Sequence, residues 1–589
     1  MNGSLRREHR RRTGSYYTPQ DIARDIVEQT LDRWIRDRHD LRGKSVSSLP
    51  TKEKEEILAS LLGLRVLDPS VGDGIFLKMT GEYLETLFLA LGDKRDGIYI
   101  REDIVKNNLF GVDIQQTAVQ DCRNTLVDWI EGKDLHHLTK DTIKQGNSLI
   151  GSIRKKDITA SNGLDLRMDW YKEFPMVFSE DRMGFDIIVG NPPYGNLLSA
   201  EEKEYVKQAF SYDIMSGRDG SWNIAPIFIV RSKDLLHAHG HMGLLLPNSI
   251  LRVGQFKKTR DFIREKLGLW SITDEGSPFE GVTLEMVSIF CSANPLSAKS
   301  EIIVKSRRKG LAGRYSICRS DLQSRIFSIY SDSLFKSIRK RGQTNLLSAT
   351  RGRDIPAQHT THEPSREFSV PYATRGRSIG RYKINDEYLT YTDDWFKQDG
   401  VLLDSFSHDF LIATKNYPYP RCVHKPKGVV HGGGVVRINS LVEDLDMKAV
   451  GLLLNSRLIR FLSIKYLTNY AQLTTCMNTG IVEEIPLVIP EDTLPISYIF
   501  DILQEMHSHE SLKEKTESLE AFVDALVYSI YLYPRSDDTE RLLDFSKSLI
   551  RKSSSRIIHD IGANDQQVVI ERVMNRSVVK KIESSPRME

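Results

Sequence analysis

A run of apolar residues in the middle of the chain stops at two successive prolines. Residues 185–190 read Phe-Asp-Ile-Ile-Val-Gly, and Asn191-Pro192-Pro193-Tyr194 follow directly. The apolar run is typical of a strand that is buried on both faces of a parallel sheet. Neither proline has an N–H group that could extend the ladder, so the chain must leave the sheet there in a stiff turn. That turn lies at the carboxyl edge, where open α/β sheets bind their ligands.

Strand and helix patterns alternate on both sides of this turn, from about residue 64 to residue 290. Further strands are expected at 65–68, 109–113, 242–247 and 282–290. Helices are expected after Gly74, over 118–130 and over 225–239. Such alternation predicts an α/β fold with a mostly parallel, doubly wound, Rossmann-like sheet that helices cover on both faces.

A glycine-rich segment, 68–77, joins the first expected strand to its helix. Its glycines let the backbone approach a ligand closely, and their spacing is not that of a dinucleotide fingerprint. Asp113 ends the next expected strand, where a carboxylate can accept hydrogen bonds from both hydroxyls of a ribose. The alternative is an ordinary strand-to-helix turn, with Asp113 as a helix N-cap.

These motifs, in this order, resemble those of gamma-class S-adenosylmethionine-dependent N6-adenine DNA methyltransferases of type II restriction-modification systems. Residues 14–23 resemble the amino-terminal motif, 68–77 the cofactor loop, 111–114 the ribose-binding strand and 146–149 the adenine-contacting strand end. The resemblance implies S-adenosylmethionine as methyl donor, held by Thr18, Asp68, Pro69, Ser70, Gly72, Asp113, Asn147 and Pro193. Many relatives carry Asp at the place of Asn147.

The resemblance also assigns the chemistry of the turn. The side-chain oxygen of Asn191 and the carbonyl of Pro192 would accept the hydrogens of the target amine and draw its nitrogen toward tetrahedral geometry. A sulfonium donor is already activated, so no metal is required. Adenine inside a duplex must be extruded to reach the turn. Tyr194 is expected to stack on the extruded base, and Phe279 is either the second stacking ring or a plain core aromatic.

Length and pattern divide the 589 residues into three expected parts. Residues 13–297 are expected to form the catalytic domain. By the resemblance, 298–492 would be an α+β target-recognition domain that binds double-stranded DNA, and 493–589 a helical carboxyl-terminal region with a basic tail. Only twelve residues precede Thr13, which leaves no room for an amino-terminal nuclease. A separate cognate restriction endonuclease is therefore expected, and an orphan methyltransferase fits equally well.

Bulk composition adds little to these expectations. The net charge is only +3, although basic residues cluster at Lys305, Arg307, Arg308, Lys309, Arg314 and Arg319. Such a cluster suits either a phosphate-tracking surface or a solvated face balanced by acids. No apolar run reaches the ~18 residues of a membrane span, and the five scattered cysteines fit reduced thiols. We expect a cytoplasmic, nucleoid-associated monomer.

The predicted function is site-specific methylation of adenine at N6 in double-stranded DNA, which would protect that DNA from a restriction enzyme. N4-cytosine methylation is one alternative, although that group more often has Ser in place of Asn191. A protein-glutamine or ribosomal-RNA methyltransferase would use the same turn chemistry. A DNA-binding subunit with an inactive methyltransferase fold is the alternative from a non-enzymatic class.

Overall fold

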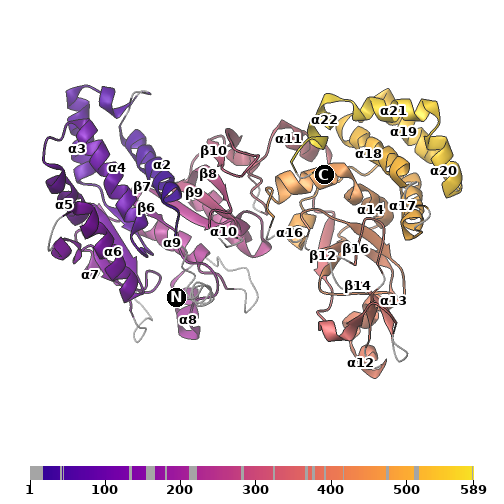
Figure 1. The fold of residues 1–589 in the computed structure, drawn as a ribbon, viewed down its shortest axis with the longest axis horizontal. Helices are drawn as coiled ribbons and strands as arrows, with labels where there is room; N and C mark the ends of the chain where they lie inside the picture. Colours follow the sequence, from indigo (N-terminus) through magenta and orange to yellow (C-terminus); the bar gives the residue numbers. More distant parts are fainter. Residues whose placement is uncertain are drawn as a thin grey trace. The chain divides into compact units, whose positions relative to one another are not determined.

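The computed structural model describes residues 17–39, 41, 43, 45–131, 135–153, 166–179, 182–210, 222–279, 284–322, 325–364, 369–373, 378–385, 387–390, 393–415, 417–472, 477–509, 512, 516–586 and 588. The chain forms two compact units (Figure 1). The first comprises Met1–Leu251 with Gln255–Ser324, and the second comprises Arg252–Gly254 with Arg325–Glu589.

The first unit is built around a nine-stranded sheet with the order β11-β10-β8-β9-β7-β6-β1-β2-β3. Its strands are β1 (Val66–Asp68), β2 (Leu109–Asp113), β3 (Ile143–Gln145), β6 (Phe185–Gly190), β7 (Leu236–Pro247), β8 (Gly268–Gly276), β9 (Met286–Ser292), β10 (Glu301–Ser306) and β11 (Gly313–Cys318). The run from β3 to β7 is parallel throughout, and β8 pairs in parallel with β10. Only the β7–β9, β8–β9 and β10–β11 pairs are antiparallel. The predicted α/β class with a mostly parallel sheet is confirmed.

Helices pack around this sheet. They are α2 (Gln20–Arg38), α3 (Thr51–Leu62), α4 (Ile75–Leu91), α5 (Gly97–Asn107), α6 (Gln116–Ile130), α7 (Trp170–Glu173), α8 (Ala200–Ala209), α9 (Ala225–Leu235) and α10 (Lys257–Lys266). A short hairpin, β4 (Phe178–Ser179) with β5 (Arg182–Met183), precedes β6. All six residues of β6 are buried, which is why its sequence is almost continuously apolar. The strands and helices on both sides of the glycine-rich segment therefore match their predicted positions.

Several boundaries differ from the expectations, and β9, for example, spans Met286–Ser292 rather than 282–290. Helix α9 ends at Leu235 rather than at His239, because Leu236 pairs with Phe185 and begins strand β7. The first unit also continues past residue 297, because β10 pairs with β8 and β11 pairs with β10. Residues 301–318 thus extend the nine-stranded sheet.

The second unit contains two four-stranded sheets, β12-β19-β16-β17 and β13-β15-β14-β18. Their strands are β12 (Leu347–Arg351), β13 (Thr360–Thr361), β14 (Val370–Ala373), β15 (Tyr388–Leu389), β16 (Phe410–Thr414), β17 (Cys422–Lys425), β18 (Val430–His431) and β19 (Val435–Ser440). Every strand pair in them is antiparallel except β14 with β18.

Helices complete this second unit. They are α11 (Ser333–Arg341), α12 (Asp393–Gln398), α13 (Gly400–Ser407), α14 (Met447–Asn455), α15 (Arg457–Leu462), α16 (Thr479–Val482), α17 (Leu494–Ser508), α18 (Thr516–Leu532), α19 (Asp537–Ser548), α20 (Ser554–Ile561), α21 (Asn564–Met574) and α22 (Ser577–Glu583). Helix α14 packs against α17, so the chain on both sides of residue 492 belongs to one body.

Candidate functional site

Four neighbouring strands end at the same edge of the large sheet, and each of them delivers a predicted site residue. The strand order is β6-β1-β2-β3, and all three pairings are parallel. Asn191 follows β6, Ser70 follows β1, Asp113 ends β2, and Asn147 lies two residues after β3. Because neighbouring strands are about 4.8 Å apart, the four positions form a row along the edge.

A cavity of about 380 Å³ opens along this row. Seven predicted site residues line it, namely Pro69, Ser70, Gly72, Asp113, Asn147, Asn191 and Pro193. Ligand pockets commonly measure ~300–1,000 Å³, so the cavity has the size of a small-molecule site. The lining extends from Pro69 to Phe228, so segments up to 159 residues apart in sequence meet around one space.

The loop after β1 is held by two carboxylates. The backbone N–H of Ser70 donates to Asp68 Oδ1 at 3.0 Å, and that of Gly72 donates to Asp113 Oδ2 at 3.0 Å. A Cβ added to Gly190 would lie 2.7 Å from Asp68 Oδ1, so glycine is required where β6 passes this carboxylate. Asp68 itself is 1% exposed and lies outside the cavity lining.

Burial sets the ionisation of both carboxyl groups. Removal from water raises the pKa of Asp68 to about 8, and the neighbouring carboxylates of Asp113 and Asp73 add to the rise against a hydrogen bond from Ser70 N–H. Burial also raises the pKa of Asp113, whereas hydrogen bonds from the backbone of Gln115 and Gly72 lower it. Near neutral pH Asp68 therefore retains its proton.

The turn after β6 is tied to the start of α2. The Asn191 side chain donates from Nδ2 to Thr18 Oγ1 at 3.2 Å, and Ser70 Oγ donates to the backbone oxygen of Asn191 at 3.5 Å. Pro192 is buried. Thr18 is thus joined to the cavity through Asn191 rather than by lining it. Of the amino-terminal motif, residues 14–16 lie outside the described part of the chain.

Neither of the two predicted stacking rings belongs to the wall of the cavity. Phe279 is 7% exposed and belongs to the apolar core cluster of the first unit. Tyr194 is half-buried and packs against the same cluster. The structure therefore brings both rings to one apolar cluster, with Phe279 as one of its buried members.

Sequence reasoning missed several residues that line the cavity. They include Glu202 and the apolar side chains of Leu197, Leu198, Ile224 and Phe228. Glu202 Oε1 accepts a hydrogen bond from Asn147 Nδ2 at 2.8 Å, and Oε2 accepts one from the backbone of Ser199 at 2.8 Å. Ser199 and Glu202 form the capping box of α8, and the Ser-x-x-Glu spacing was the available signal.

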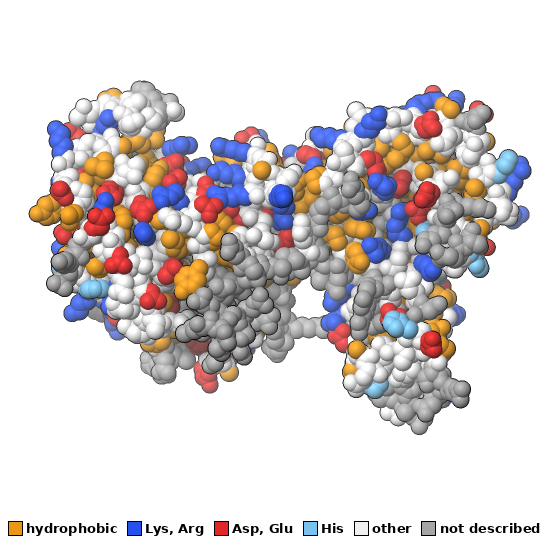
Figure 2. Space-filling view, viewed as in Figure 1, with side chains coloured by type: hydrophobic (Ala, Val, Ile, Leu, Met, Phe, Trp, Pro, Cys, Tyr) orange, Lys and Arg blue, Asp and Glu red, His pale blue; other side chains and the backbone are white. Residues whose placement is uncertain are grey.

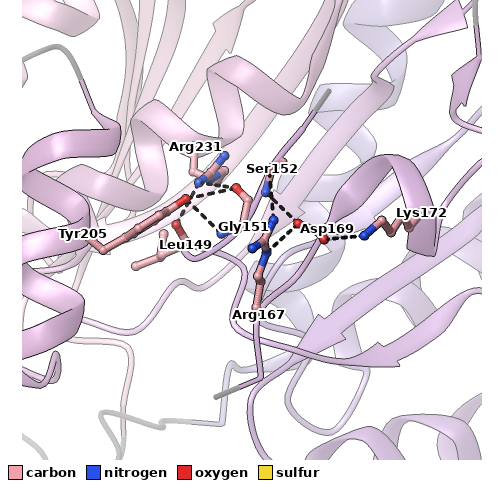
Figure 3. Close-up of polar contacts among 8 residues, drawn as sticks. All are labelled: Leu149, Gly151, Ser152, Arg167, Asp169, Lys172, Tyr205 and Arg231. Carbon is pink, nitrogen blue, oxygen red and sulfur yellow. Dashed lines mark hydrogen bonds and ion pairs between the residues drawn. The ribbon is translucent and has the colours of Figure 1, made fainter. Parts of the chain in front are cut away.

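Polar contacts fix the segment that follows Asn147 (Figure 3). The hydroxyl of Tyr205 donates to Gly151 O at 3.2 Å and accepts from Gly151 N at 3.0 Å, and Arg231 donates to Leu149 O at 2.8 Å. A Cβ on Gly151 would lie 2.1 Å from the carbonyl oxygen of Met168, so this close approach needs glycine.

An acidic side chain holds the other side of the same segment. Asp169 Oδ1 accepts from the backbone of Ser152 at 3.2 Å and from Arg167 Nε at 2.8 Å (Figure 3). Asp169 Oδ2 accepts from Lys172 at 3.1 Å. Both ends of the 149–152 segment are thus anchored, which gives the cavity a fixed wall at β3.

Three of the six residues of the basic cluster at 305–319 are paired with acids inside the first unit. Arg307 forms ion pairs with Asp21 at 3.0 Å and Asp25 at 3.2 Å, and Lys305 lies 3.8 Å from Asp25. Arg308 is buried against Asp274 and Glu285. Figure 2 likewise shows basic and acidic side chains interleaved over the face in view. For these three residues the structure favours a charge-balanced face over a phosphate-tracking surface.

The described residues contain neither a membrane-spanning helix nor a cluster of metal ligands. No helix there is both long enough and apolar enough to cross a membrane. No group of three or more His, Cys, Asp or Glu side chains in that part of the chain is arranged to hold a metal ion.

Residues 107–279 match the family model of the Eco57I restriction-modification methylase. The putative type II restriction enzyme and methyltransferase RM.MjaORFECS2P of Methanocaldococcus jannaschii is 22% identical over an alignment that covers 90% of this chain and 59% of the relative. The type II restriction enzyme and methyltransferase RM.Eco57I of Escherichia coli is 24% identical, over 44% of this chain and 26% of its own length. The chain therefore spans between about a quarter and three fifths of these curated relatives.

Solved structures share the fold. The type IIL restriction-modification enzyme MmeI in complex with DNA aligns over 99% of this chain and 80% of its own, with a TM-score of 0.56 and 13% identity. A nuclease-deletion mutant of the type ISP enzyme LlaGI, solved with a DNA substrate mimic, covers 84% of this chain and 55% of its own, with a TM-score of 0.51 and 12% identity. At these identities the likeness concerns the fold alone.

Proposed function

We propose that this chain, whose residues 107–279 match the Eco57I restriction-modification methylase model, is a site-specific DNA methyltransferase that modifies adenine at N6 (EC 2.1.1.72). The observation that carries the proposal is the single cavity that joins the glycine-rich loop, Asp113 and the Asn191 turn. A cofactor half and an acceptor half thus share one space, as methyl transfer between two bound molecules requires.

The residues around the cavity fit S-adenosylmethionine. Asp113 accepts one backbone hydrogen bond on each oxygen, from Gly72 N–H on Oδ2 and from Gln115 N–H on Oδ1. A carboxylate has about four acceptor positions, so about two remain for the ribose hydroxyls. Asp68 would stabilise the loop without lining the cavity, because it is buried and accepts a hydrogen bond from Ser70 N–H. Pro69, Ser70, Gly72, Asn147 and Pro193 would contact the cofactor directly from the cavity wall.

The acceptor turn would act on the target amine. Bound S-adenosylmethionine supplies a methyl group on a sulfonium, which needs no further activation. The exocyclic amine is a weak nucleophile because its lone pair is delocalised into the ring. The Asn191 side-chain oxygen and the Pro192 carbonyl would hold both amine hydrogens, and Thr18 would fix the amide that presents this oxygen. An amide supplies a directed dipole without the desolvation cost of a carboxylate.

The target adenine would have to leave the duplex. Extrusion costs a few kcal/mol, whereas each aromatic stack returns about 1–3 kcal/mol. Tyr194 is proposed as the first stacking ring, since it follows the turn and is only half-buried. Phe279 is proposed as the second, which would require its side chain to leave the core cluster it now shares with Tyr194.

The remaining parts would serve recognition. Residues 298–492 are proposed to hold the DNA-recognising surface, carried mainly by the second unit from residue 325, with 493–589 as its helical support. Double-stranded DNA is the proposed partner, and methylation would protect it from a restriction endonuclease activity. We place the protein in the cytoplasm, at the nucleoid, as a monomer.

Label transfer from tritiated S-adenosylmethionine to unmethylated duplex DNA tests this function. After digestion to nucleosides, the label should elute with N6-methyldeoxyadenosine. Label on N4-methyldeoxycytidine would replace the adenine assignment with the cytosine one. Label on RNA or protein instead of DNA would favour the other families that use this turn. DNA binding without any transfer would identify a non-enzymatic subunit.

A further inference from the structure

Glu202 brings a carboxylate to the end of the cavity that lies at β3. It stands in the first turn of α8, eleven residues after Asn191, and its side chain lines the cavity. Its Oε1 accepts from Asn147 Nδ2 at 2.8 Å. The loop after the acceptor turn therefore lines the cavity with Pro193, Leu197 and Leu198. It leads to Glu202, which contacts Asn147 next to β3, the last strand of the row.

The strand order indicates what this end of the cavity would bind. Asn191 at β6 would mark the reacting methyl group, and Asp113 at β2 the ribose. Three strand spacings separate β6 from β3, which amounts to about 14 Å. In the cofactor the ribose lies between the methyl group and the adenine. The adenine would therefore lie beyond the ribose, beside Asn147 and Glu202.

The hydrogen bonds at this end favour Glu202 as the reading group, meaning the side chain that recognises the base of the cofactor. The side chain of Asn147 already serves the protein through both of its polar atoms: Nδ2 donates to Glu202, and Oδ1 accepts from Leu149 N at 3.1 Å. Each oxygen of Glu202 accepts one hydrogen bond, which leaves further acceptor positions on a charged carboxylate. An exocyclic amino group offers donors that match such an acceptor.

We infer that Glu202, positioned by Asn147, accepts a hydrogen bond from the amino group of the cofactor's adenine and so selects an adenosyl cofactor. This inference rests on the proposed function. The competing role is purely structural, because Glu202 also caps α8 through the backbone of Ser199. The two roles differ in one respect: a cap stabilises the helix whatever base is bound, whereas a reading group discriminates between bases.

Binding of two matched ligands separates these roles without any turnover. S-adenosyl-L-homocysteine carries an amino group at position 6 of its purine, and S-inosyl-L-homocysteine carries a carbonyl oxygen there, which a carboxylate repels. Isothermal titration of the full chain should show much tighter binding of the adenosyl ligand. The ratio of the two dissociation constants is the preference for that ligand. Glu202→Gln should narrow this preference by about 10- to 100-fold, because an amide can donate to the carbonyl oxygen as well as accept from an amine.

Two further variants sharpen the test. Glu201→Gln removes a charge from the same first turn and should keep the wild-type preference, because Glu201 is exposed and does not line the cavity. Asn147→Asp with Glu202→Gln reverses the hydrogen-bonded pair and returns one carboxylate to this end. The double variant should regain the preference, whereas Asn147→Asp alone would set two carboxylates against each other across 2.8 Å.

The failures are distinguishable. If the wild type binds neither ligand, the proposed function is wrong. If the wild type binds the adenosyl ligand but Glu202→Gln weakens both ligands equally, Glu202 is only a helix cap and the inference is overturned. An unchanged preference in Glu202→Gln overturns it as well.

Discussion

Asn191 donates a hydrogen bond from Nδ2 to Thr18 Oγ1 at 3.2 Å, across 173 residues of sequence. The bond joins the turn after β6 to the first residues before α2. Because the amide nitrogen donates to Thr18, the hydrogen bond fixes the orientation of the amide and so the position of its oxygen. The amino-terminal motif thus orients the group that we propose as the acceptor of the target amine.

Thr18→Val tests this coupling. Valine keeps the shape of threonine but has no hydroxyl, so the amide of Asn191 would lose its orienting partner. One neutral hydrogen bond contributes about 0.5–1.5 kcal/mol, and we expect a three- to tenfold lower rate of methyl transfer. Single-turnover kinetics with saturating cofactor would measure this rate. Thr18→Ser retains the hydroxyl and should stay close to the wild type; equal losses in both variants would contradict the coupling.

Asn191→Ala removes the proposed acceptor itself. Loss of one preorganised polar contact to a reacting group typically costs about 2.7–4 kcal/mol, so turnover should fall by 10²- to 10³-fold. Affinity for S-adenosyl-L-homocysteine, measured by titration calorimetry, should change no more than a few fold. A parallel loss of cofactor affinity would show instead that Asn191 maintains the shape of the cavity.

Stability should depend on pH through Asp68, whose pKa burial raises to about 8. The folded protein then keeps a proton between pH 4 and pH 8 that the unfolded chain releases, so this carboxyl group contributes less stability as the pH rises and its contribution is lost above pH 8. From pH 6.5 to pH 8 the decline is about 1–2 kcal/mol.

Asp68→Asn is the matched variant, because asparagine keeps an oxygen for Ser70 N–H but does not titrate. The melting temperature of the wild type should fall relative to that of Asp68→Asn as the pH is raised over this range. The difference between the two proteins removes the pH dependence that other groups contribute equally to both. One such group is Glu275, whose pKa burial raises to about 7. A constant difference between the two proteins across the range would refute a protonated Asp68.

Arg308 joins strand β8 to Glu285, the residue that precedes β9. It contacts Asp274 through two nitrogens, at 3.0 and 3.1 Å, and Glu285 through a third at 2.8 Å, and all three side chains are at most 9% exposed. Arg308→Met would leave two buried carboxylates without their guanidinium, and such losses typically cost about 3–5 kcal/mol.

A surface arginine provides the control for this prediction. Arg95 also contacts two acids, Asp93 and Asp103, at 2.7 Å each, but its side chain is 40% exposed. Arg95→Met should therefore cost less than about 1 kcal/mol. Urea denaturation of both variants would measure the difference. Equal effects would show that burial is not what makes the Arg308 cluster important.

The sequence predicted those parts of the fold and site whose signals are local. The buried run of β6, its two prolines, and the glycine-rich loop between β1 and α4 each lie within about ten consecutive residues. The position of Asp113 at this edge could be predicted because it ends a recognisable strand. Parallel strands place their carboxyl ends at one edge, so the meeting of Ser70, Asp113, Asn147 and Asn191 followed from the fold class.

The missed features depend on pairings between distant segments. Glu202 meets Asn147 across 55 residues, and its capping-box spacing revealed a helix start but not a partner in the cavity. The pairing of Arg307 with Asp21 spans 286 residues, so a basic cluster looked unpaired in sequence. Helix α9 was expected four residues too long because the pairing of Leu236 with Phe185 is a tertiary contact that propensity does not contain.

Sequencing for modified bases in cells that lack other DNA methyltransferases tests the central claim most directly. Cells that express the wild-type chain should carry N6-methyladenine at one recurring DNA sequence, and cells that express Asn191→Ala at the same level should carry none there. Unmodified DNA in both strains, or equal modification in both, would contradict the account of a catalytic turn at Asn191.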